Sequence, residues 1–309
     1  MIHSLRHVAL TVPKLEIGSD YYQTFGLNQT ERAGGGALGF RCDGREHDEI
    51  VLIEGGERRK LHHISLGASA EGARQIESRL KSGNIAPLPK PASDAPEGLW
   101  FRDLTGTLIN VQIAQRQPEV NGIEVAPINR PGSVARVARR AHASIYLDAR
   151  PRRMGHIIVF TTDVAAQAEF YTKMLGMKVS DTIENGYGAF LRTPGDSDHH
   201  VIGFLKSDAP GFHHASFEME SIDYAEVAAK RLIGKGYRHA WGPGRHGVGS
   251  NYFHYFRDPW NGMAEYFNDI DWIPGDSEWQ PKDWTKKDGM FMWSADGMPP
   301  PDFGKNYEI

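Results

Sequence analysis

The stretch from Trp241 to Phe267 contains the residue types of this chain that are best suited to chemistry. It holds an imidazole (His246), a phenol (Tyr255) and a carboxylate (Glu265) at spacings of nine and ten positions. The carboxylate lies in the apolar run Met-Ala-Glu-Tyr-Phe. A charged group in such a setting is costly unless a cation pairs with it. The stretch therefore predicts a metal ion beside Glu265.

Two short strands and a glycine-rich loop must position these side chains. Residues 242–249 contain four glycines and one proline, and both residue types favour turns. The aromatic run 251–256 predicts one strand, and residues 263–267 predict a second. The Asp-Pro-Trp-Asn-Gly segment between them favours a tight turn, so we expect a hairpin.

The hairpin belongs to the second copy of an internal repeat. A strand at 5–13 and a helix at 15–25, which ends before a glycine, recur at 156–163 and 164–175. Two more pairs of segments match, namely 61–84 with 212–236 and 99–112 with 254–267. Each copy has a strand, a helix and several strands, twice over, which predicts four βαβββ modules at about 5–54, 60–115, 154–206 and 212–268.

The predicted fold class is α+β, with two tandem domains that each pair two βαβββ modules. We expect a non-catalytic N-terminal domain at residues 1–118 and an interdomain linker at 119–153. A catalytic metal-binding domain follows at 154–270, and a C-terminal tail at 271–309. The arginines of the linker indicate a solvated connection. The tail is too rich in Trp to be a disordered chain, and we expect it to lie across the second domain, over the mouth of a pocket.

Comparison of the two copies singles out the candidate metal ligands. Each copy starts with a strand histidine and carries a later His-His pair, namely His7 with 62–63 and His156 with 213–214. Glu265 follows Asp258 by seven positions, and the corresponding residue of the first copy is Asn110. Only the second copy combines two imidazoles with a carboxylate. We expect the first-copy set His7, His47 and His63 to be packing residues.

Two histidines and one carboxylate on one side of a metal leave the opposite coordination positions open. This arrangement suits non-haem Fe(II) that reacts with O₂. The open positions let one metal hold a bidentate substrate and a gas molecule side by side, which replaces a three-body encounter by a positioned one.

These residues resemble the type I extradiol ring-cleaving catechol dioxygenases of the vicinal oxygen chelate superfamily. The motifs that carry the resemblance are HIIVFTTD, FHHASFE, GPGRHGVGSN, Tyr255 and the ending FRDP…G…AEYF. The resemblance implies that His156, His214 and Glu265 are the ligands of Fe(II), for which Mn(II) can substitute. It also implies a catecholic substrate together with O₂, a muconic semialdehyde-type product of aromatic catabolism, and a homo-oligomer.

The same resemblance implies roles for three further side chains. His246 and Tyr255 match the pair that hydrogen-bonds the bound catecholate, and His200 matches the histidine that faces the O₂ position. A catechol must lose a proton to chelate a metal, and a neutral imidazole is a suitable base near pH 7. A preorganised donor such as His200 stabilises negative charge that grows on reduced O₂.

Alternatives remain at two histidine pairs. Adjacent strand residues point to opposite faces, so only one member of each pair can face the metal. His213 is the rival of His214, and His199 is the rival of His200. The family pattern favours His214 and His200.

The substrate and the reaction class also have alternatives. Trp241 stands where homoprotocatechuate-cleaving relatives have an arginine, which hints at a larger or less acidic catechol unless Arg245 or a tail residue compensates. A ligand-sequestering binding protein on the same fold would not need the three acid–base residues together. A glyoxalase- or epimerase-like enzyme usually has another carboxylate ligand to its metal. In this chain the nearest corresponding position holds Asn110, which has no carboxylate.

Composition excludes several other classes. The net charge of −4 and the pI near 6.4 do not indicate the basic surface that binds nucleic acid. The single cysteine, Cys42, excludes internal disulfides and fits a reducing cytoplasm. We recognise no signal peptide in the first residues and no apolar run long enough for a membrane helix. Fourteen histidines against one cysteine favour a metal site built from imidazole and carboxylate.

Overall fold

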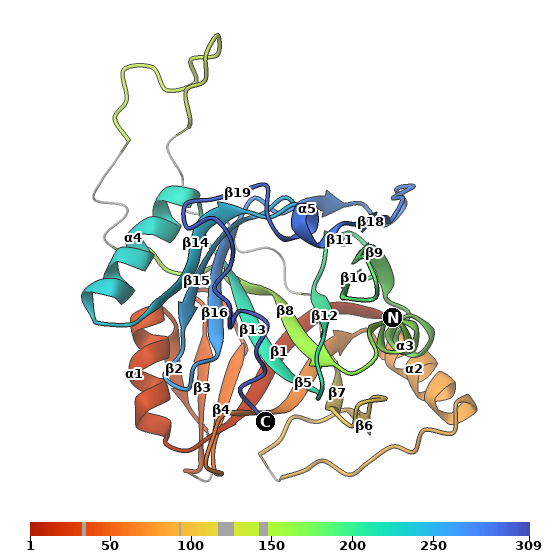
Figure 1. Ribbon diagram of the computed structural model, residues 1–309. Helices are drawn as coiled ribbons and strands as arrows, with labels where there is room; N and C mark the ends of the chain where they lie inside the picture. Colours follow the sequence, from red (N-terminus) through yellow and green to blue (C-terminus); the bar gives the residue numbers. More distant parts are fainter. Residues whose placement is uncertain (33–34, 93, 117–126, 142–147) are drawn as a thin grey trace.

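A computed structural model describes residues 1–32, 35–92, 94–116, 127–141 and 148–309 of the protein (Figure 1). The first half of the chain contains β1 (Ile2–Val12), α1 (Leu15–Phe25), β2 (Asn28–Glu31), β3 (Ala37–Arg41), β4 (Ile50–Glu54), β5 (Lys60–Ala68), α2 (Ala70–Ser82), β6 (Leu99–Arg102) and β7 (Leu108–Ile113). These strands form one seven-stranded sheet in the order β2-β3-β4-β1-β5-β7-β6.

The second half forms a larger sheet. Its elements are β8 (Arg153–Thr161), α3 (Val164–Phe170), a π-helical turn (Tyr171–Leu175), β9 (Lys178–Ile183), β10 (Gly188–Arg192), β11 (Ser197–Asp198), β12 (Ile202–Lys206), β13 (Gly211–Glu218), α4 (Ile222–Gly234), β14 (His239–Arg245), β15 (Tyr252–Arg257) and β16 (Met263–Asn268). The tail adds β17 (Trp272–Ile273), β18 (Lys282–Trp284), α5 (Lys286–Met290) and β19 (Trp293–Ser294). The ten-stranded sheet has the order β18-β9-β10-β12-β8-β13-β16-β15-β14-β19, and β11 pairs with β17.

The predicted α+β class with βαβββ modules is confirmed. The second module departs from the pattern, because its first short strand is reduced to a bridge between Leu88 and Trp100. Helix α1 ends where the sequence predicts, at Gly26, whose φ of 111° favours glycine. Helices α2 and α4 begin after Ser69 and Ser221, whose side chains accept hydrogen bonds from the first turn.

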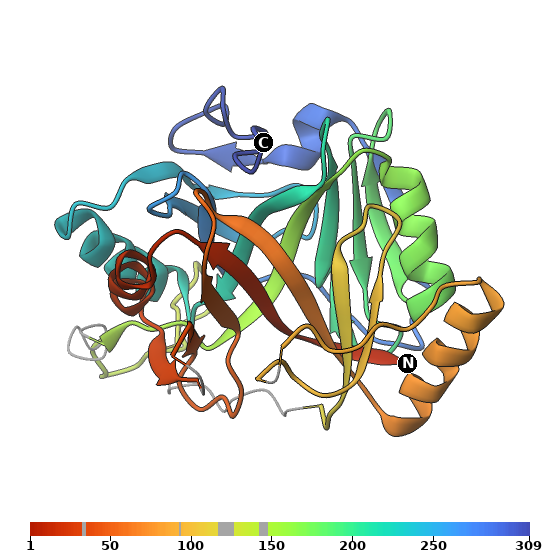
Figure 2. The same cartoon turned by 90° about the horizontal axis from the view of Figure 1, so that it is seen from below.

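The two halves share one hydrophobic core. The rings of Phe25 and Tyr266 stack at 4.1 Å across the junction, and the Tyr266 hydroxyl donates to the Phe25 carbonyl. A buried ion pair of 2.7 Å joins Arg59 of the first half to Asp258 of the second. Figures 1 and 2 show α1 beside α4 on one flank and α2 beside α3 on the other. The second sheet is thus held in place along both flanks.

The tail follows the edges of the second sheet. Strand β18 pairs with β9 at one edge, and β19 pairs with β14 at the other. Trp284 and the backbone of Lys282 donate hydrogen bonds to the Asp181 carboxylate, at 2.6 and 2.8 Å. The described part of the chain contains no helix that is both long and apolar enough to cross a membrane.

Candidate active site

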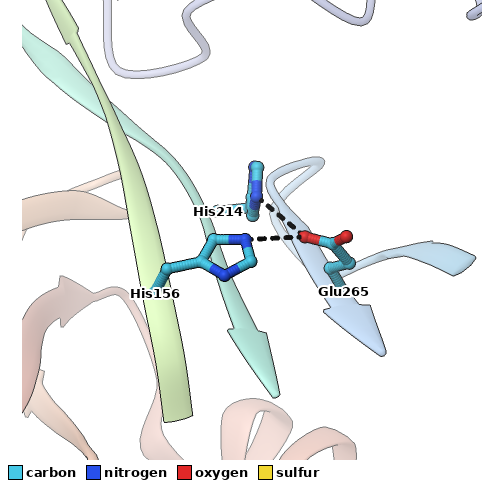
Figure 3. Close-up of side chains that lie close together, drawn as sticks. All are labelled: His156, His214 and Glu265. Atoms are coloured by element: carbon cyan, nitrogen blue, oxygen red, sulfur yellow. Dashed lines mark ion pairs between the residues drawn. The ribbon is translucent and has the colours of Figure 1, made fainter. Parts of the chain in front are cut away.

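His156, His214 and Glu265 come together on three neighbouring strands of the second sheet (Figure 3). Glu265 Oε2 lies 3.3 Å from His156 Nε2 and 3.1 Å from His214 Nε2. One donor atom from each residue lies within 4.8 Å of the other two. In the described part of the chain, this is the one group of three or more His, Cys, Asp or Glu side chains with such spacing.

Strand register explains why these three residues meet. Ser216 of β13 pairs with His156 of β8 on one side and with Glu265 of β16 on the other. His214 precedes Ser216 by two positions, so its side chain points to the same face. The three candidate ligands therefore leave one face of the sheet at adjacent positions.

Burial and proximity set the charges of the group. The exposed fractions are 2% for His156, 3% for His214 and 0% for Glu265. Burial alone would raise the pKa of Glu265, but the adjoining imidazoles lower it well below its usual value. Burial lowers the pKa of His214. A carboxylate and a neutral imidazole are the forms in which these side chains bind metals.

The donor atoms fit a metal ion. His214 Nε2 and Glu265 Oε2 are buried and have no hydrogen-bond partner, although they face one another. Two facing acceptors in a buried site are costly, and a cation between them removes that cost. Two imidazoles and one carboxylate, with room for further ligands, suit Fe(II) or Mn(II).

His246 and Tyr255 form a hydrogen-bonded pair beside this group. His246 Nε2 lies 2.9 Å from the Tyr255 hydroxyl and 3.7 Å from Glu265 Oε1. His246 Nδ1 contacts the backbone carbonyl of Met290. Because a carbonyl only accepts, Nδ1 carries the proton of the neutral ring, and Nε2 accepts from the Tyr255 hydroxyl. Burial, and then the charge of Glu265, raises the pKa of Tyr255.

A similar relay orients His214. His213 Nε2 lies 2.7 Å from the Phe303 carbonyl, so it donates, and His213 Nδ1 lies 2.5 Å from His214 Nδ1. In neutral rings His213 Nδ1 then accepts from His214 Nδ1, which leaves the lone pair of His214 Nε2 directed at Glu265. His214, the favoured member of the pair, is the one that reaches Glu265.

Strand alternation does not hold fully at this pair. Alternation along a strand predicts that His213 and His214 point to opposite faces, yet both rings line the same cavity. The pairing of β13 with β8 shifts register between Phe212 and His214, and such an irregularity turns a side chain out of simple alternation.

His200 faces the cavity and His199 does not. The ring of His200 lies 4.3 Å from the ring of His156. His199 Nε2 is 3.2 Å from Asp181, and the His199 ring packs against Trp279. Burial, and then the charge of His156, lowers the pKa of His200 well below its usual value, so its ring is neutral at pH 7.

One cavity, with a volume of about 460 Å³ including its open mouth, is lined by six of these side chains: His156, His200, His213, His214, His246 and Tyr255. Its remaining wall is largely apolar and includes Phe190, Leu205, Val248, Met290 and Phe303. No arginine or lysine lines it within the described ranges. The apolar wall suits a small, mainly apolar molecule.

Trp241 and Arg245 lie outside this cavity. Trp241 is fully buried behind Tyr255, with the two rings 5.9 Å apart and nearly parallel. Arg245 is directed away, into an ion pair of 2.9 Å with Asp269. Arg245 therefore does not supply the positive charge that an arginine at position 241 would supply.

Three contacts of the site escaped the sequence analysis. Asn251 is buried, and its amide lies 3.3 Å from Glu265 Oε1. Its place in the GVGSN segment next to His246 was the available signal. The carbonyls of Met290 and Phe303 orient the two histidines described above. Backbone carbonyls have no sequence signature, so these two contacts could not be found from the chain alone.

The corresponding place in the first half has a different character. His7 Nε2 and His63 Nε2 lie 2.8 Å apart, and burial is the main cause that lowers their pKa values to about 3 and about 2. The ring of Trp100 packs against His63 at 4.9 Å. Asn110 accepts a hydrogen bond of 2.7 Å from Ser65, so the position equivalent to Glu265 is uncharged.

Comparison with known proteins identifies the family. Residues 153–266 match the Glyoxalase/Bleomycin resistance protein/Dioxygenase superfamily. The chain is 32% identical over 298 residues to metapyrocatechase 2 of Cupriavidus necator, a match that covers 96% of this chain and 90% of that protein. It is 24% identical over 313 residues to the manganese-dependent 2,3-dihydroxybiphenyl 1,2-dioxygenase of Geobacillus genomosp. 3, covering 95% and 94% of the two chains.

Solved structures share the fold. Homoprotocatechuate 2,3-dioxygenase of Brevibacterium fuscum superposes with a TM-score of 0.77 at 18% identity, covering 99% of this chain and 92% of that one. An Mn(II)-bound glyoxalase of Novosphingobium aromaticivorans superposes with a TM-score of 0.77 at 23% identity, covering 98% and 93%. Of the three functions open from the sequence, the named curated relatives support metal-dependent cleavage of a catechol by O₂. The chain belongs to the extradiol ring-cleaving catechol dioxygenases of the glyoxalase/bleomycin resistance protein/dioxygenase superfamily.

Proposed function

We propose that the protein is an Fe(II)-dependent extradiol dioxygenase that inserts both atoms of O₂ into a substituted or bicyclic catechol in aromatic catabolism. The product is a ring-opened muconic semialdehyde-type compound. The observation that supports this function is the convergence of His156, His214 and Glu265 beside one cavity, which His156 and His214 line together with His200, His246 and Tyr255. Mn(II) is the alternative metal, and one relative is named for it.

The metal and the protein divide the chemistry. Fe(II) held by the three candidate ligands would bind the catecholate and O₂ at its open positions and supply the redox step. The protein must bind and orient the diol, remove its proton and exclude water. The apolar wall around the cavity serves the last purpose.

We assign the removal of the substrate proton to the pair of Tyr255 and His246. The Tyr255 hydroxyl donates to His246 Nε2, so its oxygen is free to accept a proton from a catechol hydroxyl. A shift of both protons leaves the charge on the His246 imidazolium, close to the carboxylate of Glu265. That carboxylate stabilises the imidazolium.

We assign His200 to the O₂ side of the reaction. Its ring is buried and lies next to the ring of His156. A neutral imidazole that is held by its surroundings donates a hydrogen bond to developing negative charge without a large reorganisation.

The cavity wall favours a substrate with an uncharged substituent. No cationic side chain of the described residues lines the cavity, and Arg245 is paired with Asp269. A carboxylate on a substituent of the catechol would lose its hydration without gaining a partner. We propose alkyl-, aryl- or bicyclic catechols as substrates and disfavour catechols whose substituent carries a carboxylate.

The test is O₂ uptake by protein purified without oxygen and loaded separately with Fe(II) and Mn(II). The panel contains catechol, 3-methylcatechol, 4-methylcatechol, 2,3-dihydroxybiphenyl, 1,2-dihydroxynaphthalene and 3,4-dihydroxyphenylacetate. We expect one O₂ consumed per ring opened and a lower kcat/KM for the carboxylated substrate. Absence of O₂ uptake across the panel with either metal refutes the function, and preference for the carboxylated member refutes only the substrate class.

Other parts of the functional description stay predictions. The domain limits at 118, 153 and 270 and the non-catalytic status of the first half follow from the repeat, and residues 117–126 and 142–147 of the linker lie outside the described residues. The homo-oligomer and the cytoplasmic location also stay predictions. Light scattering during gel filtration tests the oligomer.

A further inference from the structure

A second cavity lies at the junction between the two halves of the chain. Its wall comes from β1, the loop between β3 and β4, the segment after β7, the start of β8, residues 193–201 and β17. It has a volume of about 610 Å³, including its open mouth, and shares no lining residue with the active-site cavity.

Positive charge dominates the wall of this junction cavity. Four arginines line it: Arg6, Arg45, Arg116 and Arg153. Arg153 is neutralised by two contacts to Asp198, at 2.6 and 3.1 Å, and by one of 2.6 Å to Glu218. Arg45 lies 3.4 Å from Glu49, whereas Arg6 makes no ion pair within 4 Å with the described residues and is only partly compensated by the more distant charges of Glu49 and Glu46. Arg116 likewise makes no ion pair within 4 Å with the described residues.

Several polar atoms of the same wall are buried without a good hydrogen bond. Thr193 is 1% exposed, and neither its hydroxyl nor Arg6 Nε has a partner. His47 lines the same cavity as Arg6 and Arg45, and neither of its ring nitrogens is well hydrogen-bonded. Each such atom destabilises the folded protein if it stays unsatisfied.

The pKa values of two residues of the cavity also indicate crowded positive charge. Burial, and then the charge of Arg45, lowers the pKa of Arg6. Burial, followed by the charges of Arg6 and Arg45, lowers the pKa of His47 to about 3. Cations packed together in a partly buried site repel one another, and an anion between them relieves the repulsion.

We propose that the junction cavity is a binding site for a small anion with at least two anionic oxygens, of the phosphate or dicarboxylate type. Guanidinium groups match such oxygens with paired, charge-assisted hydrogen bonds. Arg6 and Arg45 hold the anion at the inner end together with the Thr193 hydroxyl, and Arg116 holds it from the rim, where its guanidinium lies 5.8 Å over the ring of Trp272.

Occupation of the site stabilises two segments that lead into the active site. The cavity wall at Arg153 to Gly155 continues directly into His156 on β8. The wall at Asp198 and Val201 flanks His200. The anion thus joins the first half of the chain to the strands that carry the catalytic machinery.

The experiment uses the full, metal-loaded protein and two probes, sodium phosphate and sodium succinate. Binding is measured by calorimetry, and the midpoint of thermal unfolding is measured against NaCl of equal ionic strength. The variants are Arg6→Gln and Arg116→Gln. The control is Arg74→Gln, which removes an exposed arginine that pairs only with Glu71 on helix α2.

We expect saturable binding of at least one probe and a rise in the unfolding midpoint beyond the NaCl effect. Arg6→Gln weakens binding roughly tenfold or more, because a charge-assisted hydrogen bond is lost. Arg116→Gln weakens it less, and Arg74→Gln has no effect. If Arg6→Gln does not fold, Arg116→Gln carries the test, because Arg116 lies beyond the last strand of the first sheet.

The two probes also distinguish the ligand class. Tighter phosphate binding assigns a tetrahedral anion, and tighter succinate binding assigns a dicarboxylate. The proposal is overturned if neither probe binds more than NaCl does, or if both cavity variants bind as well as the wild type. Neither result bears on catechol cleavage, which is measured separately.

Discussion

Asn110 and Glu265 occupy the same position in the two halves of the chain. Each residue pairs with a serine on the neighbouring parallel strand, Asn110 with Ser65 and Glu265 with Ser216. The backbone surroundings are equivalent, but only one half has a carboxylate. This single difference explains why one half has the donor set for a metal and the other has two histidines in contact with each other.

Glu265→Asn places in the second half the residue of the first half, and it removes the carboxylate and one methylene group. We expect metal affinity to fall more than about 100-fold. Removal of a residue that only hydrogen-bonds a metal ligand can already lower metal affinity by about 100-fold, and this variant removes a ligand itself. Metal content after anaerobic loading and dialysis is the measurement. Glu226→Gln is the matched control, since that carboxylate contacts His254 outside the site. Stoichiometric metal in Glu265→Asn would refute the ligand assignment.

His200→Phe separates oxygen chemistry from metal binding. We expect full metal content and a loss of turnover of about 10²- to 10⁴-fold, because the ring lines the cavity but does not contact Glu265. Metal analysis and O₂ uptake at saturating catechol are compared on the same sample. Loss of metal, or turnover near that of the wild type, contradicts the assigned role.

Tyr255→Phe removes one member of the proton-accepting pair and leaves the other in place. His246 keeps its contact with the Met290 carbonyl, so we expect unchanged metal content and a smaller loss of turnover than in a ligand variant. The pH profile of kcat/KM measures the effect, since proton removal from the substrate then depends on His246 alone. An unchanged profile and rate would exclude Tyr255 from proton transfer.

His213 tests the relay that orients His214. His213→Phe removes the acceptor for His214 Nδ1, and we expect metal affinity to fall about 10- to 100-fold. His213→Asn places an oxygen close to the position of Nδ1 and should recover much of the affinity. Equal metal content in both variants would show that His213 only fills space.

The Asp181 carboxylate connects tail stability to pH. Burial would raise the pKa of Asp181, but hydrogen bonds from His199, the Lys282 backbone and Trp284 lower it below its usual value. The unfolded state then binds more protons, so this contribution to stability is complete above about pH 4 and is lost as the pH falls further. Asp181→Asn should cost about 1–3 kcal/mol at pH 7.

The measurement for Asp181 is denaturant unfolding of the wild type and Asp181→Asn between pH 3.5 and 7. The difference between the two should shrink at the acid end. Asp20→Asn serves as the control, because Asp20 accepts a hydrogen bond from the Tyr237 hydroxyl, away from the tail. A difference that grows on acidification contradicts the assignment.

Much of the site was predictable because its parts have local signatures. The repeat places His156 and Glu265 on strands of equivalent modules, and glycine ends the first helix where predicted. His200 lines the cavity and His199 does not, as predicted, but both follow the end of β11, so the strand alternation assumed for this pair does not apply. Alternation fails for His213, since the register shift in β13 depends on the neighbouring strand and not on the sequence of β13 itself.

The succession of strands and helices in the modules and the candidate metal ligands could be predicted from the chain alone, because periodicity, turns and donor chemistry are local properties. The strand order of the sheets and the carbonyls that orient His246 and His213 required the folded structure, since Met290 and Phe303 lie 44 and 90 positions from the rings they contact. The folded structure also decided that arginines from separate segments share one cavity between the halves. Contacts over such distances arise from packing of the whole chain, which no local pattern specifies.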